Sequence, residues 1–178
     1  NRGVIGSLTM GAWVNADDFG AGGVGKILSH DNGGFDRTLG FDSRGDSPGT
    51  NVAAFTGASV ADVDGTFTAF GSWVHVAVRY DGANSAIFVN GVVAETFIEV
   101  TELNDSVTNL IIGTNPCCNE DFNGKLDDVF VYDRALSDAD VLDIYTNGFD
   151  TTPIPLPAGL PLLVGAVGVL AIARRAQR

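Results

Sequence analysis

The sequence predicts an all-β protein, an antiparallel β-sandwich with one short helix, followed by a C-terminal transmembrane helix. Three observations lead to this fold class. Residues 8–150 consist of short apolar runs separated by glycine, asparagine and aspartate, without sustained helical periodicity. One segment after residue 136 has the capping residues of a helix. Residues 156–173 form an unbroken apolar span.

Four short runs near the start of the chain predict strands. They are "LTMGAWV" (Leu8–Val14), "GKILSH" (Gly25–His30), "TLGFD" (Thr38–Asp42) and "NVAAFT" (Asn51–Thr56). Turn-forming residues lie between them, as expected for strands joined by short connections.

The clearest strand pattern spans Ser72–Phe97. Alternation places Val74, Val76, Val78 and Tyr80 on one face, and Trp73, His75, Ala77 and Arg79 on the other. Asp81–Gly82 predicts a turn, "AIFV" a returning strand, and Asn90–Gly91 a two-residue hairpin.

The second half of the chain predicts two more strands and the helix. The strands are "VTNLIIG" (Val107–Gly113) and "GKLDDVFVYD" (Gly124–Asp133). In "SDADVLDIYTNG", Ser137 can cap the helix with Asp140 three residues later, and Asn147–Gly148 ends it. Successive strands with tight turns favour an antiparallel sandwich.

Three blocks resemble the laminin-G-like, concanavalin A-like jelly-roll domain. They are "SLTMGAWV", "GSWVHVAVRYDGANSAIFVNGV" and "FNGKLDDVFVYDRALSDADV", in the family's order across residues 7–146. The resemblance implies a jelly-roll domain over residues 1–149. The family's usual first strand, upstream of "SLT", is almost wholly missing, so we expect a truncated N-terminus. Any ligand-binding residue that this strand contributes would then not be visible in the sequence.

The C-terminal segment has the composition of a membrane span. Leu156–Ala173 is 18 residues without a charge, and as a helix it would rise roughly 27 Å, close to the hydrocarbon thickness of a bilayer. Its prolines lie at or before its start, where a helix tolerates them. Arg174, Arg175 and Arg178 follow the span, and basic flanks stay cytoplasmic. We therefore predict a transmembrane helix with a basic tail over residues 158–178.

A proline motif, an apolar span and terminal arginines occur here in the order of the bacterial PEP-CTERM sorting signals. "PLPAGLPLL" is similar to their VPLPA variant, with Ile154 in place of valine. The resemblance implies a proline-rich linker and sorting motif over residues 150–157, processed by an exosortase. Its sorting residues would be Pro153, Pro155, Leu156, Pro157, Ala158, Arg174 and Arg175. The protein would lie in the inner membrane with a cytoplasmic C-terminus before processing, and at the cell surface or outside the cell afterwards.

The body of the chain is strongly acidic. The full sequence has a formal net charge of −12, and residues 1–150 carry seven basic and 22 acidic side chains, a net charge of −15. Such a surface repels phosphate backbones, which excludes nucleic acid as a partner. It suits an extracellular surface or one that binds hard cations.

Calcium is the cofactor that the sequence allows, because the resembling fold often holds Ca²⁺ at its rim with oxygen ligands. The candidate ligands are Asp127, Asp128, Asp121, Asn123 and Asp31. Alternation puts Asp127 on the face of Val129 and Val131, toward the core, where a charge needs an ion or a backbone partner. The alternative is that these are solvated turn residues and that Asp127 bonds to backbone.

The sequence predicts no enzyme. It has no Glu-x-Asp-x-x-Glu signature of retaining jelly-roll glycosidases and no Ser/His/Asp arrangement. His75 is expected to be a packed, hydrogen-bonded strand residue and not a catalytic base. Phe19, Phe35 and Phe122 lie in loop-like stretches, where they either stack on sugar rings or fill the core.

The prediction is a displayed or secreted recognition domain for glycan or extracellular protein. The alternatives are a structural matrix spacer, or the targeting part of a glycoside hydrolase whose catalytic part lies upstream. The adjacent Cys117 and Cys118 can form a vicinal disulfide, pair between chains or remain reduced. Arg44-Gly45-Asp46, a tripeptide of integrin ligands, is interpreted as a solvated turn.

Overall fold

The computed structural model describes residues 6–31, 35–44, 52–63, 70–100, 109–115 and 118–149. The chain divides into two compact units, Asn1–Gly148 and Phe149–Arg178. The predicted sorting motif and transmembrane helix lie outside the described residues. Within the described ranges, no helix is long and apolar enough to cross a membrane.

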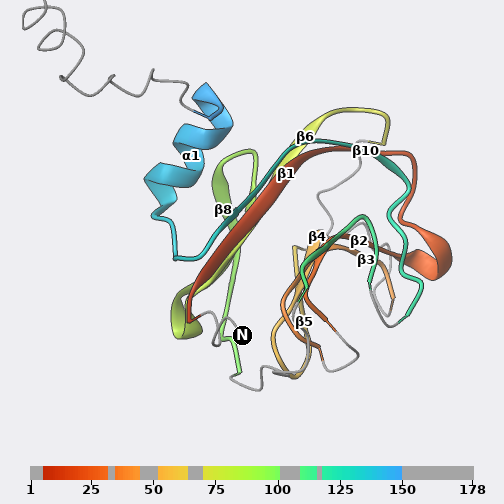
Figure 1. Ribbon diagram of the computed structural model, residues 1–178, viewed down its shortest axis with the longest axis horizontal. Coiled ribbons are helices and arrows are strands. Elements are labelled where there is room, and N and C mark those ends of the chain that lie inside the picture. Colours follow the sequence, from red (N-terminus) through yellow and green to blue (C-terminus); the bar gives the residue numbers. More distant parts are fainter. Residues whose placement is uncertain are drawn as a thin grey trace, which may run out of the picture. The chain divides into compact units, whose positions relative to one another are not determined.

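The first unit is a sandwich of two antiparallel sheets, which confirms the predicted fold class for this part of the chain (Figure 1). One sheet has the strand order β10-β1-β6-β7-β8 and the other β5-β4-β3-β2-β9. The strands are β1 (Leu8–Ala16), β2 (Val24–Ser29), β3 (Thr38–Asp42), β4 (Val52–Phe55), β5 (Val60–Asp62), β6 (Val74–Tyr80), β7 (Ser85–Val89), β8 (Val92–Phe97), β9 (Ile111–Ile112) and β10 (Gly124–Tyr132).

The main core fills the space between the sheets. On β6 the apolar alternation is as predicted, because Val74, Val76, Val78 and Tyr80 all belong to this buried cluster. Leu39 and Phe41 of β3 join it from the opposite sheet. The Tyr80 hydroxyl lies within 2.7 Å of the Thr38 carbonyl oxygen and ties the two sheets together.

The helix α1 (Asp138–Asn147) covers the outer side of the first sheet (Figure 1). Its predicted capping box is present, with Ser137 and Asp140 each bonding the other's backbone N–H. His75 is buried there against Trp13, Phe130 and Tyr145. Burial lowers the pKa of His75 to about 4, so the ring is neutral at pH 7. The predicted packing is confirmed, but neither ring nitrogen hydrogen-bonds to a described residue, contrary to the prediction.

The predicted core-facing orientation of Asp127 was wrong, whereas the alternative, an exposed Asp127 bonded to backbone, is confirmed by its hydrogen bond from the Asp128 N–H at 2.9 Å. Asp127 is exposed and pairs with Trp13 of β1, and since paired residues share a face, it lies on the α1 side of the sheet. The cause is a β-bulge: the register shifts opposite Gly11–Trp13, and Asp128 has a φ of 46°. This extra residue reverses the alternation that was counted back from Val129.

Two further differences concern short strands. β5 was not predicted, and β9 comprises two residues of the longer predicted run Val107–Gly113, of which residues 107 and 108 lie outside the described residues. Together with β2, β3 and β4 they complete the second sheet.

Candidate functional site

The outer face of the second sheet, turned away from the core, is assembled by cross-strand register. Lys26 pairs with Gly40, Gly40 with Ala53, and Ala53 with Asp62, so these four residues form one row across β2, β3, β4 and β5. Period-two alternation adds further residues on the same side. Seven residues on this side are called the candidate face below: Lys26, Gly40, Asp42, Ala53, Phe55, Val60 and Asp62.

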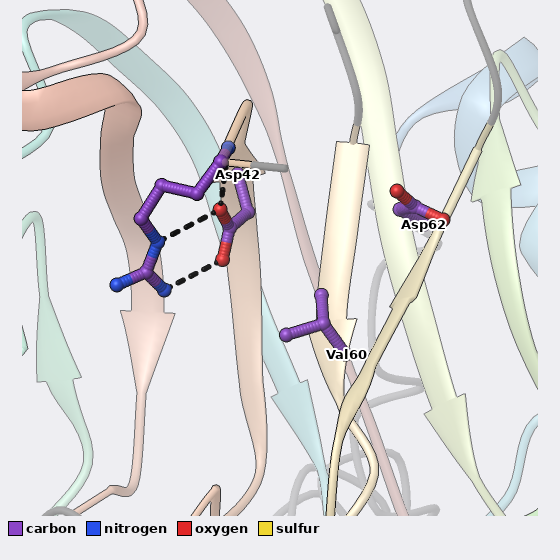
Figure 2. A pocket seen from close by; sticks show the side chains of 4 residues that line it. Asp42, Val60 and Asp62 are labelled. Carbon is purple, nitrogen blue, oxygen red and sulfur yellow. Dashed lines mark hydrogen bonds and ion pairs between the residues drawn. The ribbon is translucent and has the colours of Figure 1, made fainter. Parts of the chain in front are cut away.

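A cavity of about 250 Å³ opens on this face, lined by Asp42, Arg44, Val60 and Asp62. Figure 2 shows the Asp42–Arg44 pair on β3 and the chain directly after it, with Val60 and Asp62 across from it on β5. The Arg44 guanidinium holds Asp42 through two bonds, Nε to Oδ1 at 3.0 Å and Nη2 to Oδ2 at 2.8 Å. The lining thus combines two carboxylates, a fixed guanidinium and an apolar side chain.

Small residues form the centre of the candidate face. A Cβ atom on Gly40 would lie 2.4 Å from the Gly25 carbonyl oxygen and 3.1 Å from Cδ of Lys26. Because Gly40 has no side chain, the Lys26 side chain can cross β3 and reach β4. Its Nζ atom lies 3.6 Å from the centre of the Phe55 ring.

Lys26 is fully buried, and its Nζ atom makes no hydrogen bond to any of the described residues. Burial lowers the pKa of this amine to about 8, against the opposing charges of Glu120 and Asp42. At pH 7 the group is therefore still mainly a cation. The Phe55 ring face, 3.6 Å from Nζ, adds a cation–π contact to these charge interactions.

Asp42 stays ionised at neutral pH. Its burial alone would raise the pKa, but hydrogen bonds from Arg44 and the charge of Lys26 outweigh burial and hold the pKa below its ordinary value. Hydrogen bonding to Asp42 correspondingly raises the pKa of Arg44. Arg44 also lies 3.5 Å from a carboxylate oxygen of Glu120.

A buried amide extends this network toward the β9 edge. Asn115 Nδ2 donates to Asp31 at 2.8 Å and to Glu120 at 2.9 Å. Ser29 donates to the amide oxygen of Asn115 at 3.4 Å. Asp31, one of the predicted calcium ligands, is thus part of a hydrogen-bonded cluster beside the candidate face.

The other predicted calcium ligands lie elsewhere. Asp121 accepts a hydrogen bond from Thr114, Asn123 donates to Asp18, and Asp127 accepts from the Asp128 backbone N–H. Asp121, Asn123, Asp127 and Asp128 are all exposed. Among the residues that the structure describes, no group of three or more His, Cys, Asp or Glu side chains is placed to hold a metal ion. Calcium binding stays a prediction.

The three predicted aromatic ligand residues are divided between core and surface. Phe19 and Phe122 pack against Phe41 of the core, with ring centres at 6.1 and 6.2 Å. Phe35 is 41% exposed and contacts the edge of Phe55 at 5.1 Å, beside the candidate face. The Lys26 ammonium therefore lies against Phe55, Phe55 contacts Phe35, and Phe35 reaches the surface.

The sequence analysis missed Lys26 and Asp42, and Asp62 was considered only as a further oxygen donor for calcium. One signal was available: a lysine inside the apolar run "VGKILS" predicts an inward or shielded charge, because charged residues are rarely buried without a role. Of the Arg44-Gly45-Asp46 tripeptide, Arg44 is ion-paired, and the other two residues lie outside the described ranges. Cys118 is disulfide-bonded, and Cys117 also lies outside those ranges.

Solved structures share this fold. A Bacteroides ovatus protein provisionally assigned to carbohydrate binding is 20% identical, with a TM-score of 0.64, and the match covers 80% of this chain but 42% of that one. Domain 4 of an extracellular arabinanase from Geobacillus stearothermophilus, solved with arabinotriose, is 18% identical, with a TM-score of 0.58 and coverage of 79% and 66%. A Trypanosoma rangeli sialidase mutant with trans-sialidase activity is 16% identical, with a TM-score of 0.58 and coverage of 79% and 23%.

At these identities the solved structures show a common fold and nothing more. No curated protein matches the sequence. Residues 3–142, however, match the sequence profile of the Laminin_G_3 family, described as the concanavalin A-like lectin/glucanases superfamily. Since this match spans most of the chain, the protein belongs to the concanavalin A-like lectin/glucanases superfamily.

Proposed function

We propose that the domain is a non-catalytic glycan-binding module and that its ligand binds on the candidate face. The observation that carries the proposal is the cavity between Asp42, Arg44 and Asp62, with the exposed ring of Phe35 beyond it. Binding sites for small ligands combine a few convergent polar groups with apolar surface in this way.

The chemistry of the cavity suits a polyhydroxylated ligand. Carboxylates accept hydrogen bonds from sugar hydroxyls, guanidinium N–H groups donate to sugar oxygens, and an aromatic ring offers a flat apolar surface to a sugar ring. The Bacteroides ovatus protein and the arabinanase domain with arabinotriose support the same class of ligand.

Electrostatics favour binding over catalysis. A glycosidase needs one carboxylic acid with a raised pKa that can protonate the leaving group. In the cavity, the pKa of Asp42 is lowered by Arg44, so this carboxyl cannot serve as that acid at neutral pH. We propose that the cavity holds saccharide without cleaving it.

A glycan array tests this proposal, with the full-length chain, its Asp62→Asn variant and an Asp127→Asn control. Both substitutions remove one charge, but Asp127 is exposed on β10 of the other sheet. We expect the wild type and Asp127→Asn to bind the same saccharides, and Asp62→Asn to bind about tenfold more weakly. Saccharides released as hydrolysis products would contradict the non-catalytic assignment, and an array without signal would contradict the glycan ligand.

We further propose that the domain works outside the cell, sorted by its C-terminal segment. The support is the order of three features along the chain: a proline motif, an apolar span, and then Arg174, Arg175 and Arg178. Replacement of the three arginines by glutamine should cause mis-sorting, which fractionation of producing cells would detect. Unchanged surface display of that variant would refute the exosortase assignment.

A further inference from the structure

The burial of the Lys26 ammonium is the feature of the candidate face that the fold alone does not explain. The Lys26 side chain is fully buried, its Nζ atom donates no hydrogen bond to the part of the chain that the structure describes, and the Phe55 ring lies against it. A buried ammonium without hydrogen bonds is costly for the folded state. A methionine, which is similar in length and flexible, would fill the same space without a charge. The charges of Glu120 and Asp42 offset part of the cost of burying the ammonium, but the space around it could be filled without a charge.

The position of Lys26 connects it to the cavity. The side chain ends over Phe55, and Val60, the cross-strand partner of Phe55, lines the cavity. The charge of Lys26 also acts on Asp42, a second lining residue. Arg44 lines the cavity with a side chain that is 51% exposed, and its charge acts on Lys26, so a ligand atom would reach Nζ once the Arg44–Asp42 pair opens outward.

Charge restricts the class of ligand. Two carboxylates, Asp42 and Asp62, line the cavity, and the Arg44 guanidinium is already paired with Asp42 and Glu120. An acidic sugar would place a third carboxylate beside the first two, which like-charge repulsion disfavours. An uncharged sugar instead supplies hydroxyl donors for the carboxylates and acceptor oxygens for the ammonium.

We propose that the cavity takes one unit of an uncharged sugar and that the Lys26 ammonium donates hydrogen bonds to its oxygen atoms. Lys26 is then the specificity-determining residue of the site. This inference rests on the proposed glycan-binding function and adds the charge class of the glycan and the group that recognises it.

Calorimetry and thermal unfolding of three full-length chains test the inference: wild type, Lys26→Met and Lys125→Met. The control removes the same charge from an exposed position on β10. The probes are the neutral arabinotriose, cellotriose and tri-N-acetylchitotriose, and the acidic trigalacturonate. For the best neutral probe we expect Lys26→Met to raise Kd about 10- to 100-fold, because a charged donor is lost. Its melting temperature without sugar should equal or exceed that of the wild type by a few degrees, roughly 2–8 °C.

Four other results would contradict the inference or the proposed function. Wild-type binding that Lys26→Met leaves unchanged would overturn the role of Lys26 while the glycan-binding function stands. Tighter binding of trigalacturonate than of every neutral probe would overturn the charge class. A Lys26→Met chain that is destabilised or unfolded would show that the ammonium supports the fold, which also overturns the inference. If the wild type binds no saccharide on the array or by calorimetry, the proposed function itself fails.

Discussion

The Tyr80 hydroxyl joins the sheet that carries α1 to the sheet that carries the candidate face. It accepts a hydrogen bond from the Thr38 N–H at 3.0 Å and lies 2.7 Å from the Thr38 carbonyl oxygen and 2.9 Å from that of Phe55. Tyr80 is fully buried, so water cannot replace these contacts. Tyr80→Phe keeps the ring in the core and removes the hydroxyl alone.

The loss expected for Tyr80→Phe follows from the groups left behind. The hydroxyl has one proton, so at any time it satisfies the Thr38 N–H and one of the two carbonyls. A buried polar group without a partner costs about 1–3 kcal/mol, so two of them should lower the free energy of unfolding by about 2–6 kcal/mol. Thr38 and Phe55 belong to β3 and β4, so the same variant should also loosen the candidate face.

Urea unfolding followed by circular dichroism measures this loss. Tyr132→Phe is the matched control, because Tyr132 is partly exposed and its hydroxyl makes no hydrogen bond to any described residue. A Tyr80→Phe chain whose unfolding free energy lies within about 0.5 kcal/mol of this control would refute the reasoning.

Three further predictions concern buried charge, acid stability and the site. Arg37 and Glu99 form a buried ion pair, with Nε–Oε1 at 2.5 Å and Nη2–Oε2 at 3.1 Å. Glu99→Gln should lower the free energy of unfolding by about 3 kcal/mol, because it leaves the Arg37 charge buried without its partner. Glu95 is exposed, so the control Glu95→Gln should change the free energy little in the same urea titration. The pKa of His75 is about 4 in the folded chain, against an ordinary value of 6.5. As the pH drops from 6.5 to 4, the imidazole of the unfolded chain therefore binds a proton before that of the folded chain, and the free energy of unfolding falls by up to about 3 kcal/mol. His75→Phe should remove this part of the acid loss, and equal pH dependence of both chains would contradict it. At the site, Asp62→Asn should weaken sugar binding about tenfold on the glycan array, and Lys26→Met should raise the Kd for the best neutral sugar about 10- to 100-fold by calorimetry.

The sequence was sufficient for most of the fold. β3 has the predicted bounds, the β6 alternation is as expected, and the Ser137–Asp140 capping box starts the helix. These features depend on residues that are close in sequence, so local patterns reveal them. The bulge at Asp128 does not follow from alternation, because it arises where β10 pairs with β1, over a hundred residues away.

The candidate face was harder to predict for a related reason. Lys26, Asp42 and Asp62 come from three strands that are separated in sequence, and pairing register alone brings them to one side. The predictions searched instead for carboxylates close together along the chain, such as Asp127 and Asp128. Phe35 was identified from its loop position, whereas Phe19 and Phe122 share that pattern but fill the core.

The most direct test of the account locates the bound sugar on the domain. Amide chemical shifts of the isotope-labelled full chain would be followed during titration with the best neutral saccharide from the array. We expect the largest shifts at β3, β4 and β5, centred on Asp42, Phe55 and Asp62, with little change on α1. Shifts centred on α1 and β10, with the candidate face unaffected, would contradict the assignment of this face as the binding site.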